Sequence, residues 1–72
     1  MTIKAVNVRN QFPGRIKEIV SGPVVSEVDI QTAAGSIVTS VVTSRSIKEL
    51  GLEVGSEVIA LVKATEVAIA KI

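Results

Sequence analysis

The chain has 72 residues, of which 47% are hydrophobic, and a net charge of +1; a chain this apolar is not disordered, and so small a charge does not attract nucleic acid or an anionic membrane by its bulk field. It contains no cysteine and no histidine, which excludes disulfides and thiolate metal sites and removes the commonest general base. The length predicts a single domain, residues 1–72, whose core is so small that oligomerisation is the expected source of further stability.

The first part of the chain is rich in valine, isoleucine and threonine, which favour strands. Pro13-Gly14 predicts a turn or kink between the first two strands. Apolar and polar residues then alternate over residues 24–31, which is typical of a half-buried strand. Residues 33–35, Ala-Ala-Gly, predict a hairpin turn. The strands expected in this part of the chain are residues 3–10, 15–20, 24–31 and 36–42.

The pattern changes at residues 43–50, where apolar residues recur at helical spacing. Ser46 and Glu49 fit a capping box, and Gly51 suits the left-handed position that ends a helix. Two further strands are expected, at residues 58–63 and 66–71. These five or six short strands and the one short helix predict an all-β fold: a small five-stranded OB-like barrel with one short helix.

Several of the expected strands carry apolar residues on both faces. Ile37-Val38, Val41-Val42 and residues 58–62 are examples. A small barrel made of one chain has only one interior, so a second apolar face needs a cover. A neighbouring subunit is the simplest cover, and we expect a homo-oligomer.

The sequence supplies little for catalysis or for nucleic-acid binding. It has no tyrosine or tryptophan, its acidic residues are scattered, and we expect no enzyme. Glu27 and Asp29 share a strand face and suit a metal in principle, although acidic strand faces usually just meet solvent. Phe12 is the only aromatic residue, so the stacking platforms of nucleic-acid-binding OB barrels are missing. An OB-type nucleic-acid-associated or structural module without ligand chemistry is nevertheless the alternative interpretation.

The sequence does contain hydroxyl side chains and isolated cations, which are the groups that bind an oxyanion. Thr43 and Ser46 lie at the expected helix start, where backbone N–H groups and hydroxyls bind anions readily, although both residues also suit simple capping. Asn7 and Arg9 share one face of the first expected strand. Lys63 ends an apolar run, where it either meets an anion or reaches water by its own stem.

Three separated segments of the sequence resemble the molbindins, small molybdate-binding proteins of the Mop type with a TOBE-like domain. They are VRNQFPGRIKEIVSGPVVSEVDI, VVTSRSIKELGLEVGSEV and ALVKATEVAI, and they cover about residues 5–70. The resemblance implies an OB-like barrel that assembles as a hexamer, a trimer of dimers. It also implies that molybdate or tungstate binds between subunits, for intracellular storage or homeostasis of molybdenum, with no organic cofactor and no directly ligated metal.

The resemblance also implies which residues bind the oxyanion. Asn7 stands where the family usually has serine, and Val8 where it usually has alanine. Val25 stands where the family often has asparagine, in a segment that implies a second oxyanion site. The implied binding residues are Asn7, Val8, Arg9, Thr43, Ser46, Lys63 and Ala64. The implied second-site residues are Ser21, Gly22, Val24 and Val25.

No stretch of the sequence approaches the roughly 18 apolar residues of a membrane-spanning helix. The first residues also lack the apolar region of a signal peptide. We therefore expect a cytoplasmic protein with neither a membrane partner nor a nucleic-acid partner.

Overall fold

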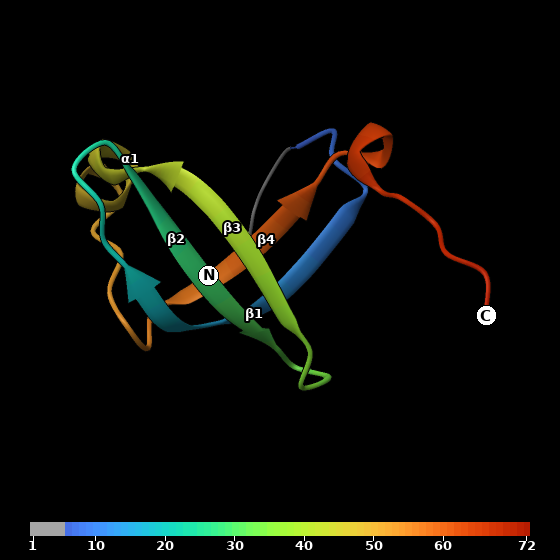
Figure 1. Ribbon diagram of the computed structural model, residues 1–72. Coiled ribbons are helices and arrows are strands. Elements are labelled where there is room, and N and C mark those ends of the chain that lie inside the picture. The colour runs from blue at the N-terminus through green and yellow to red at the C-terminus, as the bar shows by residue number, and fades with distance from the viewer. Residues whose placement is uncertain (1–5) are drawn as a thin grey trace.

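The computed structural model describes residues 6–72, which form one antiparallel sheet of four strands with a six-residue helix at one end (Figure 1). The strands lie in the order β3-β2-β1-β4, and the sheet curls into an OB-like half-barrel. This confirms the all-β fold with one short helix, although residues 6–72 contain four strands where the sequence predicted five. The elements are β1 (Asn10–Val20), β2 (Val25–Thr32), β3 (Ile37–Thr43), α1 (Ser44–Glu49), β4 (Glu57–Val62) and the 3₁₀ helix η1 (Ala64–Glu66).

The eleven-residue strand β1 explains the curl, because its two halves have different partners. Its first half pairs with β4, and its second half, from Gly14 onward, pairs with β2. Of the turn or kink predicted at Pro13-Gly14, the turn is wrong because β1 runs through both residues, and the expected strand at residues 15–20 is the second half of β1. Pro13 lies where β4 is the strand partner, so its missing N–H can face the other side. A side chain on Gly14 would place Cβ 2.3 Å from the Gln31 carbonyl oxygen, so glycine lets β2 approach.

The small core lies on the concave face of the sheet. Its buried residues are Ile16, Val28, Ile30 and Ala60. The alternation predicted for residues 24–31 is confirmed from Ser26 onward, because Ser26, Val28 and Ile30 all point inward. Val24 is the exception, since it precedes β2 and is 71% exposed.

Helix α1 begins and ends as local chemistry dictates. Thr43 is its N-cap, and the backbone N–H of Ser46 donates to Thr43 Oγ1 over 3.1 Å. The predicted capping box starting at Ser46 is therefore wrong, because β3 continues to Thr43 and the helix starts three residues earlier. Gly51 has a φ of 63°, as predicted for the residue after a helix. The N–H of Leu52 then donates to the Ile47 carbonyl, which closes the last turn.

The two ends of the chain depart from the expected pattern. Within the strand predicted for residues 3–10, residues 3–5 lie outside the described part, and residues 6–9 are not strand. The strand predicted at residues 66–71 is wrong, because Glu66 closes η1 and residues 67–72 have no strand partner within residues 6–72. In contrast, the predicted hairpin turn and the strands on either side of α1 are confirmed within one residue at each end.

Candidate functional site

Thr43 and Ser46, here called the helix-start cluster, place two hydroxyls at the junction of β3 and α1. Thr43 Oγ1 accepts from the Ser46 backbone N–H and lies 2.8 Å from Ser46 Oγ. Thr43 is exposed and Ser46 is half-buried. Thr43 is therefore the capping residue, Ser46 supplies the N–H that it accepts, and both hydroxyls remain close enough to solvent to contact a ligand.

Behind this cluster lies a ring of hydrogen bonds that the sequence interpretation left out. Ser44 Oγ donates to the Gly22 carbonyl over 2.7 Å, and Ser26 Oγ lies 2.7 Å from Ser44 Oγ. The Gly22 N–H donates to Ser26 Oγ over 3.3 Å. The one available signal was a serine on the inward face of an alternating strand, because a buried hydroxyl requires partners.

The candidate second-site residues lie in the connection from β1 to β2, beside the start of α1. The Val24 carbonyl accepts from the Ser44 N–H over 2.8 Å, and the Gly22 N–H is engaged by Ser26. Ser21, Val24 and Val25 are exposed. The fold thus places this segment next to the helix-start cluster, and one of its backbone donors is already used within the chain.

The remaining predicted site residues form a second group, here called the strand-end cluster: Asn7, Val8, Arg9, Lys63 and Ala64. Antiparallel pairing brings them together, because Asn10 at the start of β1 is the register partner of Val62 at the end of β4. The Asn10 side chain reinforces this join by donating to the Val62 carbonyl over 3.1 Å. All members are exposed except Val8, which is half-buried.

A single chain does not bring the two clusters together. Figure 1 places α1 at one end of the curled sheet and η1, which follows Lys63, at the other. The structure therefore joins five of the seven predicted binding residues in one place and the other two in another.

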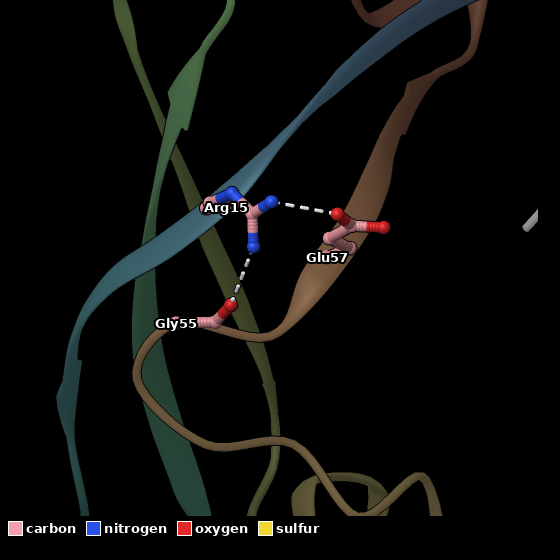
Figure 2. A network of polar contacts seen from close by, with 3 residues as sticks. All are labelled: Arg15, Gly55 and Glu57. Atoms are coloured by element: carbon pink, nitrogen blue, oxygen red, sulfur yellow. Dashed lines mark hydrogen bonds and ion pairs between the residues drawn. The ribbon is translucent and has the colours of Figure 1, made fainter.

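The ion pairs of residues 6–72 lie outside both clusters. Arg15 Nη2 lies 2.6 Å from Glu57 Oε1, and Arg15 Nη1 donates to the Gly55 carbonyl over 3.3 Å (Figure 2). Arg45 and Glu49 form a second, looser pair on α1 at 3.9 Å. In the described part of the chain, neither Arg9 nor Lys63 has a carboxylate within ion-pair distance. Both cations are thus exposed to any anion that approaches.

Residues 6–72 hold no group of three or more acidic side chains that would suit a metal ion. In the same residues, no helix has the length and apolar character needed to cross a bilayer.

Known proteins resemble this chain in family, in sequence and in structure. Residues 6–69 match the TOBE domain family. The chain is 37% identical to molybdenum-pterin-binding protein 2 of Clostridium pasteurianum, across 90% of this chain and 96% of that one. Its structure is similar to that of a molybdate-binding protein from Sporomusa ovata, with a TM-score of 0.87, 34% identity and coverage of 93% and 98%. It is also similar to the cytoplasmic molybdate-binding protein ModG with molybdate bound, with a TM-score of 0.83, 35% identity and coverage of 86% and 44%.

Proposed function

The chain belongs to the TOBE domain family, and from this membership we propose that it binds molybdate. The similar proteins support this ligand, since one of them is a molybdate-binding protein and another was solved with molybdate bound. The likeness to the Sporomusa ovata protein covers nearly the whole of both chains. We also propose that the chain is a binder and not an enzyme.

The binding site lies between subunits in this proposal. The observation that carries it is the separation of the two clusters at opposite ends of one sheet (Figure 1). A small anion contacts both clusters only if the helix-start cluster of one chain meets the strand-end cluster of another. Each chain then contributes one half to each of two sites, as symmetric assembly requires.

The chemistry of the two halves is complementary. A tetrahedral dianion offers acceptor oxygens and no proton, so it needs many donors and compensating charge. Thr43 and Ser46 supply hydroxyls, Asn7 supplies an amide, and Arg9 and Lys63 supply positive charge next to the backbone N–H groups of the strand end. Hydrogen bonds to an ionised partner are roughly twice as strong as neutral ones, so a few donors suffice.

Size discriminates among oxyanions in this site. Sulfate has the shape and charge of molybdate but is smaller, so donors placed for the larger ion leave sulfate with long hydrogen bonds. Tungstate nearly matches molybdate in size. We therefore propose that both metal oxyanions bind with similar affinity and that sulfate is rejected.

The apolar surface of the single chain supports assembly. Val41 on β3 is 66% exposed, and Ile69 in the C-terminal segment is 94% exposed. The concave face also leaves an open groove of about 400 Å³ over core residues such as Val28. Exposed apolar patches of this kind are typical of interfaces, and a hexamer built as a trimer of dimers is the proposed assembly.

We assign the protein a role in cytoplasmic storage or homeostasis of molybdenum. The cytoplasmic location described for ModG supports this compartment. No part of this role depends on nucleic acid or on a membrane.

The test combines native mass spectrometry with elemental analysis after exposure to molybdate, tungstate and sulfate in competition. We expect a hexamer that carries molybdenum or tungsten and excludes sulfate. A well-folded monomer at micromolar concentration would contradict the intersubunit site. Salt-dependent binding to single-stranded nucleic acid, without metal oxyanion, would instead favour the alternative OB-type module.

A further inference from the structure

We propose that Ser26 and Ser44 are positioning residues, whose hydrogen-bonded ring with Gly22 holds the helix-start hydroxyls at the spacing that selects molybdate over sulfate. The inference rests on the proposed function, because it assigns a part of that site to residues that the resemblance did not include. None of the ring's hydrogen bonds involves the side chain of Thr43 or Ser46, and the ring is joined to them through the backbone of Ser44.

The proton count of the ring leaves one arrangement. A carbonyl oxygen only accepts, so the single hydroxyl proton of Ser44 goes to the Gly22 oxygen. The Ser26 proton must then go to Ser44 Oγ, and Ser26 Oγ accepts the Gly22 N–H. Every donor in the ring is used, so rotation of either hydroxyl breaks a hydrogen bond.

Burial makes this arrangement rigid. Ser26 is 3% exposed and is the buried polar side chain of residues 6–72. Loss of its hydroxyl leaves the half-buried Gly22 N–H without its partner in the chain and removes the acceptor that fixes the loop. The Ser44 N–H adds another tie by donating to the Val24 carbonyl over 2.8 Å.

The ring acts on the helix-start cluster through the backbone. Ser44 follows Thr43 directly and is the first residue of α1, so fixing its side chain and its N–H fixes the junction of β3 with the helix. A glycine is needed at position 22, because a Cβ there would lie 2.3 Å from the Val25 carbonyl oxygen. The connection from β1 to β2, strand β2 and the start of α1 are therefore joined by hydrogen bonds into one rigid unit, here called the frame.

Size discrimination depends on such a frame. Donors discriminate between ions of similar shape only if they are held within about 0.5 Å of one position by a supporting shell. If the ring loosens, Thr43 and Ser46 can follow a smaller anion inward. Molybdate then loses affinity, while sulfate loses less or gains.

The experiment measures molybdate and sulfate affinity of the full chain by competition in Ser44→Ala, Ser26→Ala and the double variant. We expect each single variant to lower molybdate affinity about tenfold, as loss of a supporting residue around a bound ion commonly does. We also expect each to lower the ratio of molybdate affinity to sulfate affinity. The double variant should lose little more than one single variant, because both residues act in one ring. Ser44→Thr keeps the hydroxyl and should keep the parent ratio.

Ser56→Ala is the matched control, because Ser56 Oγ accepts the Glu53 N–H in a different turn. It should leave the ratio unchanged. If Ser44→Ala and Ser26→Ala lower the melting temperature but keep the parent ratio, the ring is merely structural and the inference is overturned. If Ser26→Ala fails to fold, the affinity ratio of Ser44→Ala alone tests the inference, because Ser44 is only half-buried. A parent protein that binds no molybdate overturns the proposed function itself, which is a separate result.

Discussion

The helix-start cluster and the strand-end cluster differ in how far one chain organises them. Thr43 and Ser46 are hydrogen-bonded to each other, and Gly22, Ser26 and Ser44 form a ring of hydrogen bonds beside them. Arg9 and Lys63 are exposed, and neither forms an ion pair with any residue from 6 to 72. The fold of one chain therefore fixes the hydroxyls of the helix-start cluster. The cations of the strand-end cluster have no anionic partner within residues 6–72, and a bound anion would supply one.

This difference separates stability from binding. At the helix start, the hydroxyls proposed to bind the anion also form hydrogen bonds that stabilise the fold, so a substitution there affects both the free energy of unfolding and the anion affinity. At the strand end, the cations contribute little to folding, so a substitution there affects binding alone. The effect of a substitution on affinity is expected to be largest at the strand end and smallest at a site outside both clusters.

Lys63→Met is expected to abolish or severely weaken molybdate binding. Loss of one partner from a desolvated charge pair typically costs about 2–5 kcal/mol of binding free energy. Because Lys63 is exposed in the single chain, the free energy of unfolding without anion should hold within about 0.5 kcal/mol. Calorimetric titration and melting curves with and without molybdate measure both quantities, and the molybdate-induced rise in melting temperature should vanish.

Lys17→Met provides the control for that variant, since Lys17 is an exposed lysine on β1 outside both clusters. It should bind molybdate like the parent. Parent-like binding by Lys63→Met would mean that the lysine stem only reaches water and that the proposed site is wrong.

Thr43→Val should reduce both affinity and stability. The variant keeps the shape of the side chain but removes the hydroxyl that accepts the Ser46 N–H. We expect an affinity loss of about 1–3 kcal/mol, from an unpaired buried partner, and a stability loss of about 1 kcal/mol, from the missing cap. Thr39→Val is the matched control, because Thr39 donates to Asp29 elsewhere on β3. A stability loss without an affinity loss would reduce Thr43 to a helix cap.

Mixed oligomers of Lys63→Met and Thr43→Val chains test whether the clusters of one site come from different chains. Each variant carries one intact cluster. With equal, random mixing, about one quarter of intersubunit sites receive both intact halves and regain parent affinity. Coexpression of two differently tagged chains, followed by tandem purification and titration, gives the fraction of restored sites. If both halves come from one chain, no site of parent affinity appears.

Local chemistry predicted much of the fold, and long-range pairing decided the rest. The alternation in β2 and the left-handed Gly51 were readable because each depends on near neighbours. The turn expected at Pro13-Gly14 failed because the register of β2 begins at Gly14, a fact that no local pattern contains. Residues 66–71 alternate well enough for a strand, but a strand also needs a partner, and residues 6–72 offer none.

The candidate site divides in the same way. The residue types of the strand-end cluster were readable, but their proximity depends on a pairing between Asn10 and Val62, which lie 52 positions apart. Thr43 and Ser46 are both hydroxyl residues three positions apart, so the capping residue became evident only from where β3 ends. Ser44 gave no signal of its own, because its role depends on Gly22 and Ser26.

The smallest effect is expected for Glu57→Gln, outside both clusters. The Arg15–Glu57 pair is exposed, with side chains 63% and 65% accessible, and such pairs contribute about 0.2–1 kcal/mol. Glutamine keeps an acceptor for Arg15, which also retains the Gly55 carbonyl (Figure 2), so the stability loss should lie at the low end and shrink further in high salt. Five residue steps along β4 separate Glu57 from Val62, or about 17 Å at strand spacing. That span is about two Debye lengths at physiological ionic strength, so removal of the negative charge should leave molybdate affinity unchanged. Denaturant unfolding at two salt concentrations and a molybdate titration check the two expectations. A clear gain in affinity would show that charge outside the clusters contributes to the site, and the strand-end cations would then not act alone.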